Sequence, residues 1–280
     1  IDDIVPGLIE GKDKLYYAMG AHGEFDQQVI GWVNSIAANG RSGTQPPGEF
    51  VQLGQYLHEL RLFKRKQEIA VMRQAAAITG DAHRRIMMLT EPGMYEYQLE
   101  AELEYSFMSN GARTPAYPTI VGGGSNACVL HYIQNDNVLR KGDLVLVDAG
   151  CEYESYAADV TRTFPVSGKF SKAQAELYSL VLAAQQAAID QVQPGNNWNQ
   201  PHEAALVVLT EGLIRLGLLQ GEVDEALETG TYKKYCMHKT GHWLGLDVHD
   251  VGEYKVGGEW RVFEEGMITT IEPGLYIAED

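Results

Sequence analysis

The stretch from Leu144 to Phe164 contains two strand-like segments, each of which carries an aspartate. The first, LVLV, is a continuous apolar run of the kind found in strands covered on both faces, and it ends in Asp148. The second carries Asp159 next to Val160 and among threonines, which favour strands. We therefore predict two strands that bring two carboxylates to the same region of a sheet.

The spacing of the two aspartates predicts how they meet. If the strands form a hairpin that turns between Tyr153 and Glu154, Asp148 and Asp159 are equally far from the turn and lie opposite each other. Side chains in that position are about 5 Å apart, so the two charges repel unless a cation or a shared proton lies between them. We favour a cation. In the alternative interpretation, Asp148 caps a turn and Asp159 is an exposed strand residue, because aspartate is common in turns.

The composition indicates a globular protein and limits its partners. The chain has 280 residues, 45% of them hydrophobic and 21% charged, which suits one large or two ordinary domains. A net charge of −16 argues against a nucleic-acid partner, whose phosphates would be repelled, and no apolar run is long enough to predict a membrane span. The three cysteines form no CxxC pair, so we expect a reducing compartment, the cytoplasm, and no disulfides.

The pattern of charged and apolar residues predicts two domains and an α+β fold. Charged residues become frequent after Leu62, so we divide the chain into residues 1–62 and 63–280. Helical periodicity over 66–88 and 96–109 predicts two long helices. Strand-like runs follow, then further amphipathic helices and strands, which is typical of a largely antiparallel sheet covered by helices.

Two further apolar runs are predicted strands. Residues 127–132 follow three glycines that we interpret as a turn, because no nucleotide-binding motif accompanies them. Residues 267–271 end in Glu272, which a Pro-Gly pair follows. This order of strand, carboxylate and tight turn repeats the order found at Asp148.

Three of the eight histidines, His238, His242 and His249, lie within twelve residues. Histidines four apart on a helix can bind zinc, but glycines in this segment disfavour a helix and no HExxH motif is present. A single histidine here would more often be a hydrogen-bonded core residue. Three together, with Asp250 available to orient one of them, predict a functional site.

The candidate donors are two aspartates, Glu272 and one histidine, which form an oxygen-rich set with a single nitrogen. Such a set favours a hard or borderline divalent ion such as Mn²⁺, Co²⁺ or Zn²⁺, and it disfavours a structural zinc, which prefers sulfur and several nitrogens. Several carboxylates also suit two ions, because bridging oxygens neutralise two dications close together.

Three motifs, VDAGCEYESYAADVTRTF, HWLGLDVHDVG and TIEPGLYI, resemble the metal-site motifs of aminopeptidase P, the Xaa-Pro aminopeptidases of the pita-bread metallopeptidase family. The resemblance extends from Phe63 to the C-terminus. It implies the creatinase/aminopeptidase-like pita-bread fold and two divalent ions, usually manganese, with cobalt or zinc as alternatives. It also implies release of the N-terminal residue from a peptide with proline in second position, by attack of a hydroxide that bridges the ions.

The resemblance also implies a role for each motif residue. Four positions match the family's metal ligands: Asp148, Asp159, His242 and Glu272. Glu272 is in addition the expected proton acceptor, His131 lies near the attacked peptide bond, and His249 helps to hold the substrate carbonyl. His238 lines the substrate pocket.

Two departures from the family pattern concern the ends of the chain. The family's fifth ligand is a glutamate on a later strand, and Glu279 is too close to Glu272 to replace it. Residues 1–62 match only the end of the family's N-terminal domain, so we expect a longer parent protein, truncated here at both ends, and a homo-oligomer for that parent. The rival interpretations are a prolidase, which cleaves Xaa-Pro dipeptides with the same metal residues, and a catalytically silent relative that binds peptides or proteins.

Overall fold

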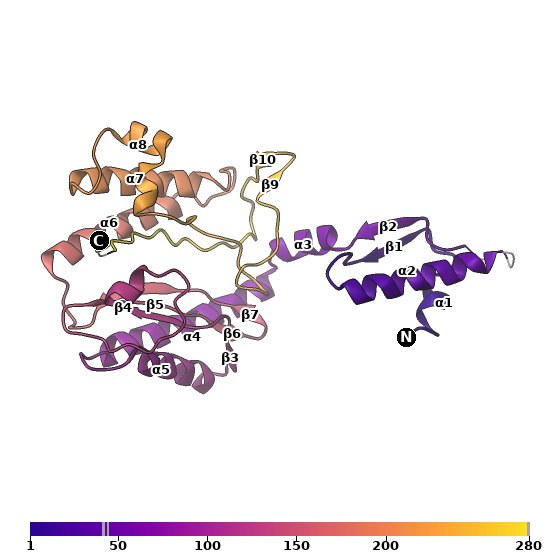
Figure 1. Ribbon diagram of the computed structural model, residues 1–280, viewed down its shortest axis with the longest axis horizontal. Coiled ribbons are helices and arrows are strands. Elements are labelled where there is room, and N and C mark those ends of the chain that lie inside the picture. Colours follow the sequence, from indigo (N-terminus) through magenta and orange to yellow (C-terminus); the bar gives the residue numbers. More distant parts are fainter. Residues whose placement is uncertain (41–42, 44, 279–280) are drawn as a thin grey trace. The chain divides into compact units, whose positions relative to one another are not determined.

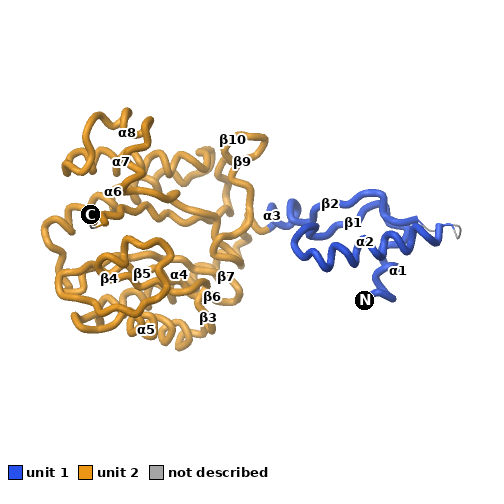
Figure 2. The backbone as a smooth tube through the Cα atoms, in the orientation of Figure 1, with its two compact units in different colours: residues 1–60 blue, residues 61–280 orange. Residues whose placement is uncertain are grey.

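The computed structural model describes residues 1–40, 43 and 45–278, which form two compact units (Figure 2). The first unit is Ile1–Leu60 and the second is Arg61–Asp280. All the motif residues that the structure describes lie in the second unit. That the first unit is the end of a larger domain stays a prediction.

The first unit is a small combination of helices and parallel strands. Its elements are α1 (Val5–Ile9), β1 (Lys14–Tyr17), α2 (Gly23–Ala38), β2 (Glu49–Gln52) and most of α3 (Gly54–Leu62). β1 and β2 pair in parallel. Buried apolar side chains form its core: Ile9, Val29, Trp32 and Ile36.

The second unit combines long helices with short strands (Figure 1). Its α-helices are α4 (Lys66–Leu89), α5 (Glu96–Ser109), α6 (Lys172–Ile189), α7 (Gln200–Arg215) and α8 (Val223–Thr229). Its strands are β3 (Thr114–Pro115), β4 (Ile120–Gly123), β5 (Leu144–Asp148), β6 (Cys151–Tyr153), β7 (Tyr156–Ala157), β8 (Thr161–Pro165), β9 (Lys255–Val256) and β10 (Glu259–Trp260). Two short 3-10 helices are η2 (Gly124–Cys128) and η3 (Thr231–Lys234).

The strands β4, β5 and β8 form an antiparallel sheet with β5 in the centre. Val145 and Val147 of β5 are fully buried and pack in one core with apolar side chains of α4 and α5. Because alternate side chains point to opposite faces of a strand, Asp148 lies on the face away from these helices, where β5 is only half-buried. The sheet therefore offers a carboxylate on its free face.

The helices α6 and α7 cover the C-terminal segment. Leu180 of α6 and Leu209 of α7 belong to one apolar cluster with Ile271 and Leu275. In Figure 1 the C-terminal segment runs between these helices and the β4–β5–β8 sheet. Within the described residues, no helix is long and apolar enough to cross a membrane.

The structure confirms the predicted fold class of helices packed on antiparallel strands. The helices predicted over 66–88 and 96–109 are confirmed as α4 and α5. The second helix ends as expected, since Gly111 leaves the helical region with φ of 90°.

Two predicted strands are wrong. Residues 127–132 contain the end of η2 and a turn in which His131 has φ of 56°, a backbone conformation that a strand does not contain. Residues 267–271 are extended and bond residues 240–244 through their backbone, but they form a single bridge, between Thr269 and Trp243, and no regular strand. At 127–132 apolar character did not determine the backbone conformation, and at 267–271 it predicted the extended backbone but not the lack of a regular strand.

Candidate metal centre

The hairpin that carries the two aspartates differs in register from the prediction. Asp148 pairs with Thr161, and the hairpin closes at Glu154 and Ser155, which both have positive φ (50° and 67°). A two-residue turn with positive φ at both positions is a type I′ turn, whose twist suits a hairpin, and it lies one residue beyond the predicted turn. The predicted pairing of Asp148 with Asp159 is therefore wrong. Asp159 lies diagonally across from Asp148, on the same face.

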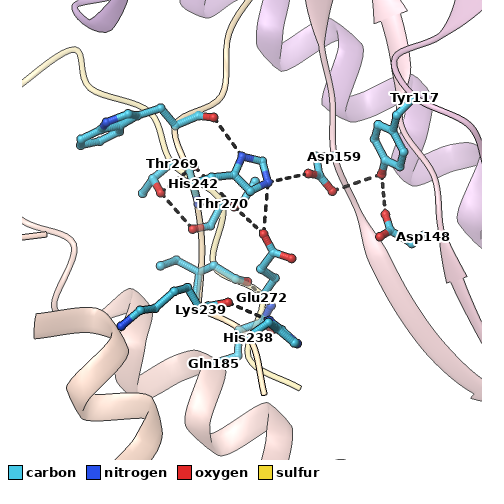
Figure 3. A network of polar contacts seen from close by, with 12 residues as sticks. Tyr117, Asp148, Asp159, Gln185, His238, Lys239, His242, Thr269, Thr270 and Glu272 are labelled. Atoms are coloured by element: carbon cyan, nitrogen blue, oxygen red, sulfur yellow. Dashed lines mark hydrogen bonds and ion pairs between the residues drawn. The ribbon is translucent and has the colours of Figure 1, made fainter. Parts of the chain in front are cut away.

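Tyr117 links the two carboxylates (Figure 3). Its hydroxyl oxygen is 2.5 Å from Asp148 Oδ1 and 3.1 Å from Asp159 Oδ1. Burial, followed by the negative charges of both aspartates, raises the pKa of Tyr117 well above its usual value. The hydroxyl therefore stays protonated and donates to one carboxylate at a time. Sequence reasoning missed Tyr117, because its segment, PAYP, carries no motif that marks a polar role.

Close backbone packing brings the aspartates together. A Cβ atom on Gly150 would lie 1.7 Å from the carbonyl oxygen of Ala158, so only glycine fits where these two segments of the hairpin approach each other. From α4, the buried His83 bonds the carbonyl of Ala149, with Nε2 and the oxygen 3.1 Å apart. The backbone next to each aspartate is thus held by a specific contact.

His242 and Glu272 come from two extended segments that pair through backbone hydrogen bonds. The amide of Thr270 donates to the carbonyl of His242 (2.9 Å), and the amide of Glu272 donates to the carbonyl of Thr240 (2.7 Å). A Cβ atom on Gly241 would lie 2.1 Å from the Thr270 carbonyl oxygen, so this close pairing requires glycine. The pairing places the His242 and Glu272 side chains on one face.

Three of the four predicted ligands have donor atoms close together (Figure 3). His242 Nε2 is 3.1 Å from Asp159 Oδ2 and 3.2 Å from Glu272 Oε1. Within the part of the chain that the structure describes, these three side chains form a group whose donor atoms all lie within 4.8 Å of one another. His242 Nδ1 is 2.9 Å from the Trp243 carbonyl oxygen, which leaves Nε2 to face the carboxylates. The fourth predicted ligand, Asp148, joins the group only through the tyrosine.

The charges of this group are unfavourable without a cation. Burial, followed by the charge of Asp159, raises the pKa of Asp148 from 3.8 to about 7. Burial would lower the pKa of His242, but hydrogen bonds with Asp159 and Glu272 raise it from 6.5 to about 10. Without a metal, protons must therefore compensate the clustered carboxylates near neutral pH. Three carboxylates and one imidazole are donors that Mn²⁺, Co²⁺ and Zn²⁺ accept, so these residues fit a divalent metal centre.

His249 and His131 are accessible beside this group. The exposed ring of His249 lies edge to face with the His242 ring, with 4.3 Å between the ring centroids. Burial, followed by the positive charge of His242, lowers the pKa of His249, and the charge of His131 contributes to that shift. His131 is exposed on its turn. A molecule bound at the donor group would meet both imidazoles.

His238 contacts Tyr276 and the backbone rather than the donor atoms. Its Nδ1 is 2.7 Å from the Lys239 carbonyl oxygen, and its Nε2 is 2.9 Å from the Tyr276 hydroxyl. Because Nδ1 donates to the carbonyl, Nε2 accepts the hydroxyl proton. Burial would raise the pKa of Glu272, but the hydrogen bonds with His242 and Thr270 lower it. Sequence reasoning missed Tyr276, although it lies in the third motif.

Asp250 forms ion pairs with two cations. Contrary to the prediction, it bonds no histidine among the described residues. Its Oδ2 is 3.0 Å from Lys64 Nζ, and its Oδ1 pairs with Arg61. The carboxylate that was expected to orient a histidine directly is thus fully engaged elsewhere. Glu279, the other acidic residue considered near the C-terminus, lies outside the described residues.

We expect the Asp148→Asn variant to be more stable than the wild-type protein at pH 8 once a chelator has removed divalent metals. The folded state raises the pKa of Asp148 from 3.8 to about 7. The stability that Asp148 contributes is fully present at a pH below its pKa in the unfolded state. It is lost as the pH rises through its pKa in the folded state, because the carboxylate then ionises beside other carboxylates. The amide removes this ionisation, so the free energy of unfolding should rise by about 4 kcal/mol at pH 8 and hardly change at pH 4. Urea unfolding at both pH values measures the difference.

Asp3→Asn, at an exposed position, is the matched control for this comparison. It should change neither free energy by more than about 0.5 kcal/mol. With excess Mn²⁺ the wild-type protein should instead be more stable than Asp148→Asn, because the variant lacks a charged metal donor. A chelated Asp148→Asn protein that is less stable than the wild type at pH 8 would contradict the account of crowded carboxylates.

Comparisons with known proteins identify relatives of this chain. The model of "Metallopeptidase family M24" matches residues 70–280. The Xaa-Pro aminopeptidase of Escherichia coli (strain K12) is 44% identical over 273 residues, which cover 98% of this chain and 62% of that protein. The Xaa-Pro dipeptidase of Mus musculus is 37% identical over 238 residues, which cover 79% of this chain and 48% of that protein.

A solved structure is similar to nearly the whole chain. The aminopeptidase PepP of Pseudomonas aeruginosa is 56% identical with a TM-score of 0.98, and the match covers 99% of this chain and 63% of that one. The chain thus spans less than two thirds of the length of each of these three relatives.

Proposed function

The chain belongs to metallopeptidase family M24 and has its pita-bread α+β fold, and from this membership we propose that it carries the catalytic site of a metal-dependent Xaa-Pro aminopeptidase. The proposed reaction releases the N-terminal residue from a peptide whose second residue is proline. The observation that supports it most directly is the group of donor atoms of Asp159, His242 and Glu272, all within 4.8 Å of one another. A purely structural site has no need of clustered carboxylates that repel one another without a cation.

The proposed metal donors are these three residues together with Asp148. Their carboxylates suit two divalent ions; manganese is the family's usual metal, and cobalt and zinc accept the same donors. When bound, such ions supply Lewis-acid chemistry, lowering the pKa of water and polarising a carbonyl. Tyr117 bonds Asp148 and Asp159, which orients both carboxylates toward the site.

We assign the proton transfers to Glu272 and His131. The hydroxyl of Thr270 donates to Glu272 Oε1 (2.8 Å), which orients the carboxylate so that it can accept the proton of the attacking water. His131, exposed on its turn, donates a proton to the proline nitrogen as the peptide bond breaks. That nitrogen carries no hydrogen in the peptide, so it needs a proton from outside to become a good leaving group.

His249 and His238 are the proposed substrate-binding residues. Burial lowers the pKa of His249, which favours the neutral ring at pH 7, and that ring can donate one N–H to the substrate carbonyl, where negative charge develops. His238, held by Tyr276, forms part of the wall of the substrate site.

The peptide is the one partner that this proposal assigns. The expected absence of nucleic-acid and membrane partners, the cytoplasmic location and the homo-oligomeric parent rest on the sequence and stay predictions.

Product analysis of matched peptides tests the proposal. We expect the purified protein with Mn²⁺ to release the first residue of a tripeptide that has proline in second position. A matched tripeptide with alanine there should be cleaved at least about 100-fold more slowly, because the site is expected to recognise the proline ring. Chelation should abolish the activity, and added metal should restore it.

The same experiment separates the rival functions. The 37% identity to the mouse Xaa-Pro dipeptidase makes prolidase the main alternative. Cleavage of an Xaa-Pro dipeptide without cleavage of the tripeptide would assign that function. Binding of the peptide without hydrolysis in the presence of manganese, cobalt or zinc would instead assign a catalytically silent relative.

A further inference from the structure

A buried ion cluster lies next to His249 in the chain. Asp250 Oδ2 is 3.0 Å from Lys64 Nζ, and both side chains are only 1% exposed. Arg61 adds a second cation, which pairs with Asp250 Oδ1 and lies 2.6 Å from Asp247 Oδ2. Buried ion pairs contribute little net stability, because removing the charges from water offsets their attraction. The cluster therefore calls for an explanation other than stability.

The cluster fixes the turn that contains His249. The amide of Asp250 donates to the carbonyl of Trp243 (3.0 Å), and Asp250 Oδ1 accepts from the amide of Val251 (3.0 Å). A Cβ atom on Gly245 would lie 2.0 Å from Asp250 Oδ2, so the turn packs directly against the buried carboxylate. The residue after His249 is thus held by its backbone and by its side chain.

The cations are on a segment that is itself anchored. The amide of Lys64 donates to the carbonyl of Gly266 (2.9 Å). Leu62, between the two cations in sequence, is fully buried in an apolar cluster with Trp243 and Phe263. Lys64 and Arg61 therefore provide a fixed point for Asp250, unlike cations on a flexible surface segment.

His249 has little other support for its position. Within the described residues its exposed ring makes the edge-to-face contact with His242 but no hydrogen bond. An exposed side chain without hydrogen bonds samples several rotamers, so the backbone on either side determines where its ring can lie. On one side that backbone is the residue held by the ion cluster.

We propose that Arg61, Lys64 and Asp250 form a positioning cluster that places His249 against the substrate carbonyl. The inference rests on the proposed function, because His249 meets a carbonyl only in that reaction. The three residues act through His249 and not on the substrate themselves. Loosening the turn shifts the imidazole, and a shift of about 1 Å in a catalytic group can cost about 100-fold in rate.

A double-mutant cycle tests this assignment. The variant Lys64→Met/Asp250→Asn removes both buried charges together, which avoids leaving one of them unpaired. We expect its kcat on the proline tripeptide to fall about 10- to 100-fold with unchanged metal content. In the His249→Ala background the same two substitutions should change kcat less than about twofold, because the group they position is already absent.

An exposed ion pair provides the matched control. Arg84→Met/Asp81→Asn likewise replaces a cation by methionine and an aspartate by asparagine, in α4, on side chains that are 68% and 67% exposed, and should leave kcat unchanged. If the double variant does not fold, Lys64→Met alone keeps Arg61 as a partner of Asp250. It should show a smaller loss of kcat with the same dependence on His249.

Several results would overturn the proposal. If the double substitution lowers kcat by the same factor in the wild type and in His249→Ala, the cluster acts elsewhere. If the double variant loses metal, the cluster supports His242 instead. The imidazole NMR signals of His249 give a readout that does not need activity: they should shift or broaden in the double variant and not in the exposed-pair control. Unchanged signals overturn the proposal, whereas a wild-type protein without Xaa-Pro cleavage contradicts the proposed function alone.

Discussion

We expect the Asp159→Ala variant to lose at least about 10³-fold in turnover of Xaa-Pro peptides. Asp159 connects the two halves of the site, because its Oδ2 is 3.1 Å from His242 Nε2 and its Oδ1 is 3.1 Å from the Tyr117 hydroxyl. Alanine removes both oxygens, and the loss of Lewis-acid catalysis is worth several kcal/mol, at about 1.4 kcal/mol for each factor of ten. Turnover at saturating Mn²⁺ and elemental analysis of the same samples measure the effect.

Two further variants make this result specific. Asp190→Ala changes an exposed aspartate at the end of α6 and should keep wild-type turnover and metal content. Asp159→Asn retains one oxygen without the charge, so its turnover should lie between those of the alanine variant and the wild type. Wild-type turnover by Asp159→Ala at saturating metal would refute the role of Asp159 as a donor.

The sequence predicts the parts of the second unit that local rules determine. α5 ends at Ser109 because Asn110 and Gly111 follow it, and Gly111 adopts the positive φ that ends helices. The apolar run of β5 is a strand, and Val145 and Val147 are buried as its composition requires. These features depend on residues that are close together in the chain.

Features for which the local sequence carries no signal were missed. The hairpin register depends on positive φ at Glu154 and Ser155, residue types that seldom adopt it and so give no signal. Tyr117 reaches Asp148 and Asp159 across 31 and 42 positions, and no spacing rule relates residues that far apart. The sequence therefore indicated which carboxylates meet, but not their geometry or the hydroxyl between them.

The incorrect strand at 127–132 has a related cause. The fully buried carboxylate of Glu96 accepts hydrogen bonds from the Gly123 amide (2.8 Å), the Asn137 amide (3.0 Å) and the Tyr132 hydroxyl (2.7 Å). A buried carboxylate is costly unless such donors surround it. The loop that carries His131 consequently closes around Glu96, a requirement that the apolar pattern of the loop does not reveal.

We expect His242→Ala and His249→Ala to fail in different ways. His242 supplies a nitrogen to the donor group, so its alanine variant should bind less metal and lose turnover in proportion to that loss. His249 lies beside the group without belonging to it, so its variant should keep its metal and lose about 10²- to 10³-fold in kcat, the effect of removing one donor to a developing negative charge. His131→Ala should also keep its metal and lose about 10²-fold or more, because the proline nitrogen then leaves without a proton donor.

Metal titration separates these roles on the same samples. Excess Mn²⁺ should partly restore turnover of His242→Ala, because mass action refills a weakened site, and it should not restore His249→Ala, whose defect is a missing hydrogen bond. His22→Ala, at the exposed N-cap of α2, is the histidine control and should match the wild type in metal content and kcat. Metal loss in His249→Ala combined with full occupancy in His242→Ala would reverse the two assignments, because the ring that holds the metal would then be the exposed one.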